Sequence, residues 1–535
     1  MDKLETELTT LENADLVRRL LGEELAYLFK HALTREAAYE SLLLKRRQAL
    51  HHSVGLAFEK LYSEHSEENT TLLAYHFERS EDWEKAIDYL QQAARWARRR
   101  VAHREEAELL GHAISIASRT GKNELVALLH AQRGRAFANL TQYADARPEF
   151  EAAIAGLPSE QAEERAEVLS DLAMVCTWLL DVPGTRHYAN MGLALAEQLG
   201  RNDLAASAMG ALAFTQSSDG LTRDSLKSFQ RAAVRAGNVR SRPLAAGIET
   251  WAIVLYWVGN FTQAEEKSRE AAQMAEELND SAVYMRALGD LGLAWMGAGR
   301  YGEAIRAFTQ VREFGKKHGL GTWTARAMAM QSGCHLLVFD FAGAEALAKE
   351  ARDLARSANF IGPLVSAGID LLFNYVRRQE VSLAMSLMPE VADAVARAKG
   401  SHGWLWRMRL AQVRAELALA HGNWEDAVKA ASEVITQGRA TGRVKYTVAG
   451  LGVRGRALAK LGRKSKGLTD VRLALKQARK LGDPAVFLQA AANSLALELD
   501  DALTAEARDV ARQVAATLPT LRLREQFEAT TSEMF

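Results

Sequence analysis

One short pattern recurs along most of the chain: a glycine or another turn residue, an aromatic residue, two further residues and then alanine. Its clearest copies have their aromatic residue at Phe261, Tyr301, Phe341 and Trp424. With weaker copies included, the alanine position returns every 39–43 residues from Ala146 onward. A fixed period of this length indicates a repeat protein, in which each unit packs mainly against its neighbours.

Each period contains two stretches in which apolar residues have helical spacing. In one copy, the apolar residues from Leu288 to Trp295 lie on one face of a helix, and Gly299 marks the turn before the second stretch. Small residues in both stretches allow two helices to approach closely. We therefore expect Gly292 and Ala304 to face each other where the two helices cross.

These residues resemble the tetratricopeptide repeat (TPR), whose pattern is W-x2-L-G-x2-Y followed by A-x3-F. The resemblance implies an all-α, TPR-like α-solenoid, a right-handed superhelix of antiparallel helix pairs. The period of about 40 residues exceeds the usual 34, and longer helices would absorb the difference. HEAT repeats also run roughly 40–47 residues, but they are not expected to repeat the turn-aromatic-x-x-Ala pattern.

Two places depart from the regular pattern. Ala86 and Ala107 are separated by half a period, so we expect one of the helices there to be short. Pro389 falls in the middle of an expected second helix, within the repeat that has the longest spacing. Proline removes a helical hydrogen bond, and we therefore expect a break or kink near Met388.

Residues 25–60 follow a different pattern. They resemble the junction in bacterial signal-transducing ATPases and class III nucleotide cyclases at which an ATPase module passes into helical repeats. The shared phrases are F-x-H-A-L from Phe29, Y-x-x-L from Tyr39 and R-x-x-L-H from Arg47. We expect residues 1–65 to form a helical segment of this kind and residues 66–535 to form a TPR-like solenoid of roughly 10–11 repeats.

Sequence motifs for catalysis are missing. The chain contains no G-x-x-x-x-G-K-[ST] phosphate-binding loop, no HExxH, no CxxC and no G-x-S-x-G. We expect no enzyme activity, no cofactor and no metal. The resemblance then implies a sensor-type piece of such a regulator, or a stand-alone relative that acts on a separate ATPase or cyclase module.

Charge and composition limit the partners. Lys and Arg number 67, equal to Asp and Glu, whereas nucleic-acid-binding proteins usually carry a basic domain or stripe. The three arginines at 98–100 are best read as a solvated helix end. No signal peptide and no apolar run of membrane-spanning length is visible, so we expect a cytoplasmic protein with no membrane partner. Cys176 and Cys334 lie in apolar helical stretches and are expected to be buried thiols.

In TPR arrays the first helix of each repeat faces the concave groove. The groove positions of the repeat, mapped onto this sequence, hold aromatic residues, arginines and glutamates. They are Trp178, Phe214, Glu249, Tyr256, Trp257, Arg286, Arg326, Phe373, Arg377, Arg409 and Glu416. Arginine beside aromatic residues suits a carboxylate or phosphate on an otherwise apolar ligand. The alternative is that the longer helices bury some of these side chains against neighbouring repeats.

The sequence favours a ligand- or protein-binding scaffold or sensor in signalling or transcriptional regulation. The alternative is a regulatory fragment that controls a separate ATPase or nucleotide cyclase; a nucleic-acid-binding solenoid is a third class, which the neutral charge disfavours. The partner is a protein or peptide, or a small-molecule inducer, and the sequence leaves that choice open. If the concave face is the site, Trp257→Ala and Arg326→Ala should spare folding and weaken binding.

Overall fold

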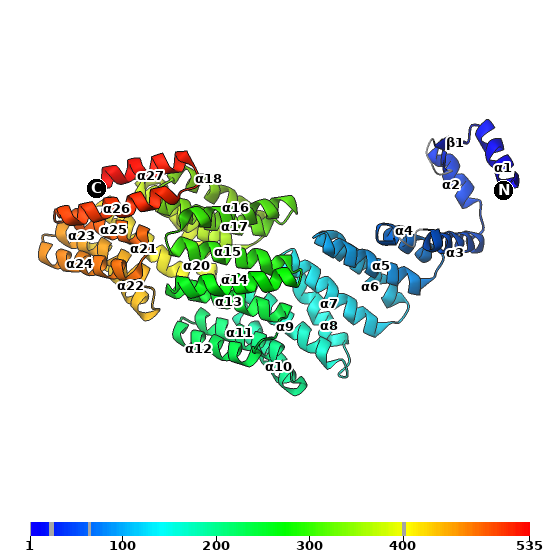
Figure 1. The fold of residues 1–535 in the computed structure, drawn as a ribbon, viewed down its shortest axis with the longest axis horizontal. Coiled ribbons are helices and arrows are strands. Elements are labelled where there is room, and N and C mark those ends of the chain that lie inside the picture. Colours follow the sequence, from blue (N-terminus) through cyan, green and yellow to red (C-terminus); the bar gives the residue numbers. More distant parts are fainter. Residues whose placement is uncertain (1, 21–25, 62–65, 399–402) are drawn as a thin grey trace. The chain divides into compact units, whose positions relative to one another are not determined.

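The computed structural model describes residues 2–20, 26–61, 66–398 and 403–535, and helices dominate these ranges. The chain divides into two compact units, residues 1–129 and 130–535. Successive helices form antiparallel pairs (Figure 1). This confirms the all-α, TPR-like class that the repeat pattern predicts. The expected boundary near residue 65 concerns where the repeats begin, and it stays a prediction.

The first unit consists of short elements followed by longer helices. Its elements are α1 (Asp2–Asn13), β1 (Val17–Leu20), β2 (Ala26–Phe29), α2 (Ala32–Glu40), α3 (Leu44–Leu61), α4 (Ser66–Arg79), α5 (Trp83–Arg99), α6 (His103–Arg119) and the first part of α7 (Asn123–Asn139).

Strands β1 and β2 form an antiparallel hairpin, in which Val17 pairs with Phe29 and Leu20 with Ala26. The prediction of an entirely helical N-terminal segment is therefore wrong for these eight residues. Aromatic and branched side chains favour strands, but strands of four residues are too short to show a period in the sequence.

The irregular spacing before Ala146 has a different cause from the one expected. Helices α5 and α6 both contain 17 residues. The step from Ala86 to Ala107 therefore spans one helix and its turn rather than a repeat with a shortened helix. Both alanines are buried. The small residue thus marks the start of consecutive helices in this region, and the expectation of a short helix is wrong.

The second unit holds the regular repeats. Its helices after α7 are α8 (Tyr143–Gly156), α9 (Ala162–Trp178), α10 (Val182–Leu199), α11 (Asn202–Ser218), α12 (Thr222–Ala236), α13 (Arg242–Val258), α14 (Phe261–Glu277), α15 (Ser281–Gly297), α16 (Tyr301–Lys317), α17 (Gly321–Leu337), α18 (Phe341–Ser357), α19 (Ile361–Arg377), α20 (Val381–Arg397), α21 (Gly403–His421), α22 (Trp424–Ala440), α23 (Val444–Lys460), α24 (Lys464–Leu481), α25 (Pro484–Leu495), α26 (Asp501–Thr517) and α27 (Leu521–Met534).

The recurring sequence pattern marks the junction between the two helices of a repeat. Its aromatic residue is the first residue of the second helix, as at Phe261 in α14. The preceding Asn260 caps that helix, because its side-chain oxygen accepts a hydrogen bond from the Gln263 amide at 3.3 Å. Gly259 ends the first helix with φ of 84°, a left-handed conformation that glycine adopts without steric cost.

The close crossing of paired helices involves glycine and phenylalanine. A Cβ atom placed on Gly292 would lie 2.6 Å from the ring of Phe308, which is fully buried. Gly134 and Phe150 repeat this contact at 2.8 Å. Ala304 is fully buried but is not among the nearest neighbours of Gly292. The expected close crossing therefore exists, and its nearest contact to Gly292 is the ring of Phe308, one helical turn after Ala304.

Helix α20 runs unbroken through Pro389, so the expected break near Met388 is wrong. Pro389 lies on the exposed side of the helix, where water can bond to the carbonyl group that proline leaves without a partner. The long spacing of this repeat arises after α20, from the connection that follows it and from the 19 residues of α21.

The C-terminal helices return to the second unit's earlier repeats. The Tyr301 hydroxyl donates to Asp483 Oδ1 at 3.2 Å and accepts from the Ala485 amide at 3.0 Å. The Gln526 amide donates to the Phe339 carbonyl at 2.9 Å. These partners are 182–187 residues apart in sequence. Figure 1 shows α26 and α27 beside α16 and α18, so the solenoid closes on itself after one turn.

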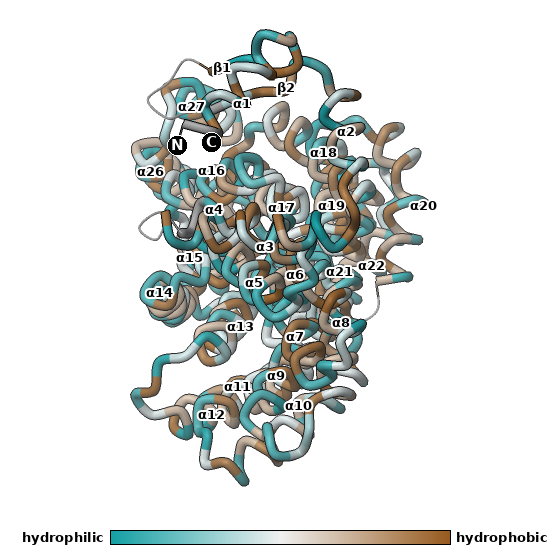
Figure 2. The backbone as a smooth tube through the Cα atoms, turned by 90° about the vertical axis from the view of Figure 1, so that its right-hand side faces the viewer, coloured by the Kyte–Doolittle hydropathy of each residue, from teal (hydrophilic) through white to brown (hydrophobic). Residues whose placement is uncertain are grey.

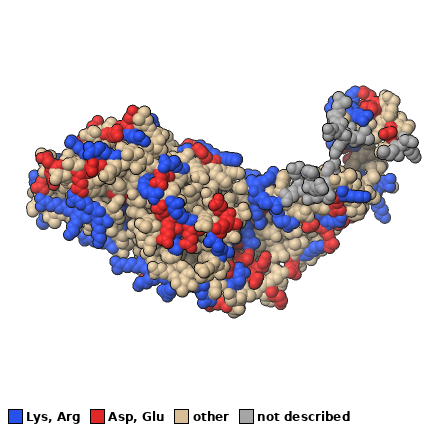
Figure 3. All heavy atoms as spheres, in the orientation of Figure 1, with Lys and Arg blue, Asp and Glu red and all other residues tan. Residues whose placement is uncertain are grey.

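The outer surface is that of amphipathic helices. Hydrophobic and hydrophilic residues alternate along the helices of the second unit in Figure 2. On the face drawn in Figure 3, acidic side chains gather over α14 and basic ones over α24. In the described part of the chain, no helix is both long enough and apolar enough to cross a bilayer.

The glycine–phenylalanine contact makes a direct test of the packing. We expect Gly292→Ala to lower the free energy of unfolding by about 1–3 kcal/mol, because the added methyl group overlaps the Phe308 ring. Gly321→Ala is the matched control, since nothing lies within 4 Å of a Cβ at that helix residue. Urea unfolding followed by circular dichroism measures both. Equal stabilities of the two variants would contradict the contact.

Candidate functional site: a cavity enclosed by the first helices

A cavity of about 750 Å³ lies inside the second unit. Its wall comes mainly from the first helices of successive repeats, from α9 to α25. Because the C-terminal helices return to the earlier repeats, α23, α25 and α27 also form part of this wall. An open groove would lack these three helices. Cavities of this size with a largely apolar lining suit small molecules or short peptide segments.

Nearly all the groove residues predicted from sequence line this one cavity. They are Trp178, Phe214, Glu249, Tyr256, Trp257, Arg326, Phe373, Arg377, Arg409 and Glu416. Arg286 is the exception: it lies behind the wall, with its Nε 3.2 Å from Glu249 Oε2. The first helices therefore do face a common space. The binding role of these residues stays a prediction.

Several of the aromatic residues are part of the core as well as of the cavity wall. Trp257 is 2% exposed and packs against Phe214, with ring centroids 5.6 Å apart, and against Trp404 at 6.3 Å. Removing a buried aromatic side chain costs about 3–5 kcal/mol. The expectation that Trp257→Ala spares folding is therefore incompatible with the structure. The alternative reading, burial by the longer helices, holds for this residue.

Ion pairs connect neighbouring first helices across the wall. Each joins an arginine to a carboxylate of the adjacent repeat, and most are buried. The pairs are Arg286–Glu249 at 3.2 Å, Arg326–Asp290 at 3.0 Å, Arg409–Asp370 at 2.5 Å and Arg377–Glu416 at 3.5 Å. The arginines predicted to bind a ligand anion therefore already have anionic partners within the protein.

Two of these pairs meet in one buried cluster. Burial raises the pKa of the Asp290 carboxyl well above its usual range, and the adjacent Glu249 carboxylate raises it further, although Arg326 opposes both effects. Oε1 of Glu249 and Oδ2 of Asp290 have no hydrogen-bond partner among the described residues. Protonation of Asp290 would reduce the repulsion between these two buried carboxyl groups.

The indole of Trp178 lies beside this cluster, at the cavity wall. The guanidinium of Arg286 lies 5.6 Å from its ring and that of Arg326 lies 5.1 Å from it. Tyr143 stacks on the same indole with a centroid distance of 5.9 Å. Because the indole face attracts cations, it holds both guanidinium groups at this end of the cavity.

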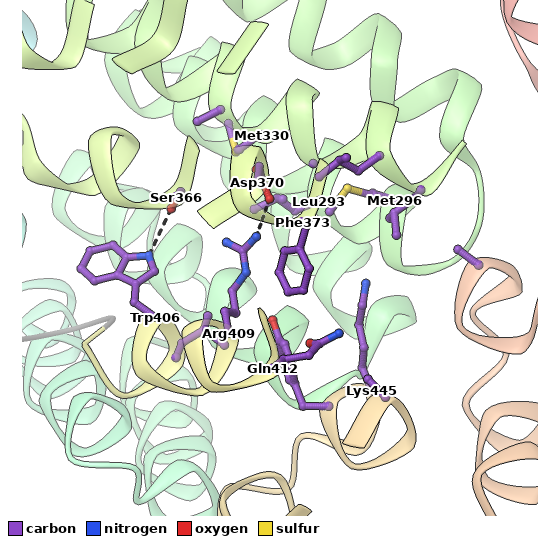
Figure 4. Close-up of a pocket in the computed structure, with 18 of the residues that line it drawn as sticks. Leu293, Met296, Met330, Ser366, Asp370, Phe373, Trp406, Arg409, Gln412 and Lys445 are labelled. Carbon is purple, nitrogen blue, oxygen red and sulfur yellow. Dashed lines mark hydrogen bonds and ion pairs between the residues drawn. The ribbon is translucent and has the colours of Figure 1, made fainter. Parts of the chain in front are cut away.

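Figure 4 shows the centre of the cavity. Arg409 extends from α21 to Asp370 on α19, and the ring of Phe373 stands beside it. The indole N–H of Trp406 donates to the Ser366 hydroxyl at 3.1 Å. Lys445 enters from α23, toward the space between Phe373 and Met296. The centre thus combines a mostly apolar surface with a small number of charged groups.

Sequence reasoning missed the contribution of α23. Arg443, Lys445, Tyr446 and Arg456 all line the cavity. The sequence could have identified Arg456 as a cavity residue. Arg377, Glu416 and Arg456 occupy the same position in three successive repeats. Arg443 and Lys445 gave no such signal, since they reach the cavity only because α23 lies opposite α13 after a full turn.

Two histidines of the first unit lie in contact with each other. His51 and His76 bring their Nδ1 atoms within 3.0 Å of each other, and the Tyr39 hydroxyl contacts Nε2 of His51 at 2.9 Å. Burial is the largest cause that lowers the pKa of both imidazoles. Over the ranges that the structure describes, no group of three or more His, Cys, Asp or Glu side chains could hold a metal ion.

The raised pKa of the Asp290 carboxyl predicts a pH dependence of stability. A carboxyl group whose pKa is raised on folding stabilises the folded state while it is protonated, and that contribution is lost as pH rises from about 4 through the raised pKa. Asp290→Asn keeps the neutral geometry and cannot ionise. We expect the stability of this variant relative to wild type to grow with pH, by up to about 1.4 kcal/mol per pH unit.

Chemical unfolding at pH 5, 6.5 and 8, followed by tryptophan fluorescence, measures this difference. Asp353→Asn is the control, because Asp353 is 75% exposed and pairs only with Arg356 on the surface. Its difference from wild type should not change with pH. A pH-independent difference for Asp290→Asn as well would mean that Asp290 is ionised in the folded protein.

Comparisons with known proteins bear on the fold. No family model and no curated protein matches the sequence. Among solved structures, a Rap protein complexed with Competence and Sporulation Factor is similar over 67% of this chain and 99% of its own, with 12% identity and a TM-score of 0.52. The match to Cut9 of the APC/C hetero-tetramer Cut9–Hcn1 covers 94% of this chain and 99% of Cut9, with 12% identity and a TM-score of 0.43. The match to yeast Tom70 covers 88% of this chain and 96% of Tom70, with 11% identity and a TM-score of 0.31. The likeness to the Rap protein concerns fold alone, and together with the helix pairs described above it identifies this structure as an all-α, TPR-like solenoid.

Proposed function

We propose that the second unit is a binding module whose ligand, a short peptide or a small molecule, occupies the cavity lined by the first helices. The observation that carries this proposal is the cavity of about 750 Å³ lined by successive first helices. A folded chain stabilised only by packing would be expected to fill such a space with side chains. The Rap protein of similar fold is described as complexed with Competence and Sporulation Factor, which supports a comparable binding role here.

The module has no catalysis of its own in this proposal and acts as a sensor in signalling or transcriptional regulation. Several charged side chains of the wall are held in pairs between neighbouring helices, as Arg409 and Asp370 are. A ligand that touches several first helices would therefore change how adjacent repeats sit against one another. That is a route by which binding inside the solenoid can be transmitted to a partner protein.

A cavity-filling substitution tests the binding role. Met330 lines the cavity and is only partly buried. We expect Met330→Trp to preserve the thermal melting temperature and to weaken binding of the neutral fluorescent probe N-phenyl-1-naphthylamine at least tenfold, because the indole occupies the probe's space. Fluorescence titration of the full-length protein measures the affinity.

Met385→Trp makes the same exchange on the outer side of α20, where Met385 is 51% exposed, and should bind the probe as wild type does. Equal affinities for wild type and Met330→Trp would contradict a ligand site in the cavity.

The first unit supports a second function, docking of a separate ATPase or nucleotide cyclase. More than half of the large hydrophobic side chains that the structure exposes lie in the first 75 residues. Leu33 and Leu43 are 79% and 81% exposed. A segment that exposes many large apolar side chains is a candidate interaction site. The resemblance of residues 25–60 to an ATPase-to-repeat junction favours a partner of this class.

We expect the wild-type chain, purified from its native organism, to bring with it an activity that hydrolyses or cyclises ATP. A charge on the apolar surface should abolish that association, so Leu33→Asp combined with Leu43→Asp should lose it. Leu499→Asp is the control, since Leu499 is 92% exposed in the second unit. ATP turnover by the purified fractions measures the result, and equal activity in all three samples would contradict docking at this surface.

A further inference from the structure

The cavity wall carries an excess of positive charge. Six cationic side chains line it against three carboxylates. The cations on α17, α19 and α21 are Arg326, Arg377 and Arg409, and each has a carboxylate partner at 2.5–3.5 Å. The other three cations all belong to α23 and the residue before it. The excess is thus confined to one helix.

These three cations, Arg443, Lys445 and Arg456, have no carboxylate within hydrogen-bonding distance among the described residues. Arg443 donates to the Tyr256 carbonyl at 3.3 Å. Lys445 forms a long ion pair with the buried Asp483, with Nζ 3.7 Å from Oδ2, a distance at which no hydrogen bond is made. The N–H groups of Lys445 and Arg456 therefore remain available to a further acceptor.

Arg456 differs in this respect from the arginines at neighbouring positions. Burial lowers the pKa of the Arg456 guanidinium, and the more distant Glu416 only partly offsets this effect. For Arg409, burial acts in the same direction, but the bonded Asp370 raises the pKa above its usual value. Arg456 keeps solvent exposure on the cavity wall, so its guanidinium stays hydrated without a protein partner and has room for a ligand anion. An anion placed beside it would add the charge-assisted hydrogen bonds that the other arginines of the wall already make.

The surface opposite α23 is apolar. Leu293 and Met296 of α15, Met330 of α17 and Phe373 of α19 face the centre of the cavity (Figure 4). Lys445 extends toward the same space. A ligand that fills the cavity therefore meets hydrocarbon and aromatic rings on one side. On the other side it meets cations that have no hydrogen-bonded carboxylate.

We propose that α23 is the anion-binding wall of the cavity, and that its ligand has a carboxylate or phosphate group, held by Lys445 and Arg456, and an apolar or aromatic body. The assignment rests on the ligand-binding role proposed above and adds the chemical class of the ligand. Guanidinium and ammonium groups both bind these oxyanions by charge-assisted hydrogen bonds. Arg443, which is 6% exposed and fixed to Tyr256, supports the wall electrostatically.

Two fluorescent probes of the same shape separate this inference from the proposed function. 8-Anilinonaphthalene-1-sulfonate carries a sulfonate on the rings of N-phenyl-1-naphthylamine, which is neutral. Only the probe fluorescence that Met330→Trp abolishes is counted, because it reports binding in the cavity. For this fluorescence, we expect wild type to bind the anionic probe at least tenfold more tightly than the neutral one. Lys445→Met combined with Arg456→Gln should reduce that preference to twofold or less and leave the neutral probe's affinity within twofold of wild type.

Lys460→Met is the matched control, because Lys460 is an exposed residue of the same helix and does not line the cavity. It should keep the full preference for the anionic probe. If neither probe gives a signal that depends on Met330, the cavity is not a ligand site and the proposed function fails. If the neutral probe binds there and the double variant keeps the wild-type preference, the binding role stands and the anion-binding wall is overturned.

Competition identifies the source of the anionic group. Dodecanoate and dodecyl phosphate should both displace the anionic probe from wild type, and both should do so at least tenfold more weakly in the double variant. The tighter of the two shows whether the wall prefers a carboxylate or a phosphate. Displacement that is equally strong in the double variant would overturn the role of Lys445 and Arg456.

Discussion

The closure of the solenoid on itself determines most of what is distinctive in this structure. An open array of helix pairs presents a groove with one wall, whereas here Tyr301 bonds to Asp483 and to the Ala485 amide one full turn later. Tyr301 is 1% exposed, so these hydrogen bonds are shielded from competing water. The contact places α23 and α25 opposite α13 and α15. The cavity and the charges on its wall both follow from that placement.

The buried ion pairs of the wall are better understood as positioning devices than as sources of stability. Removing Arg409 and Asp370 from water costs free energy that their attraction in the interior roughly offsets. Each pair nevertheless requires its two helices to hold one relative position, because a shift of a few ångströms separates the charges. Pairs at Glu249–Arg286 and Asp290–Arg326 connect three successive first helices in this way. In the proposed binding role, such a wall would respond to a ligand as a connected unit rather than helix by helix.

The parts of the structure that could be predicted are those that depend on neighbouring residues. The period, the helix pairs, the cap at Asn260 and the close approach at Gly292 all follow from local spacing. The same spacing showed which positions face inward, and for that reason Trp178 and Phe373 are both found in the cavity wall. The hairpin was missed because strands of four residues leave no period. The unbroken helix at Pro389 was missed because it depends on whether water reaches the carbonyl group that proline leaves without a partner. The exposure of that carbonyl is set by the packing of the folded chain.

The cavity's chemistry could not be predicted, because it depends on partners that only the closed turn brings together. In the sequence, Arg326, Arg377 and Arg456 are equivalent, since each is an arginine at an inward position of a first helix. The structure distinguishes them: the first two have carboxylates at 3.0 and 3.5 Å, and Arg456 has none within hydrogen-bonding distance among the described residues. A positive side chain gains most from a ligand anion where the protein has supplied no anion of its own. Some cationic residues of the wall have no hydrogen-bonded carboxylate on a neighbouring helix, and these lie on α23. Under the proposed binding role, they are the residues with the greatest capacity to bind a charged ligand.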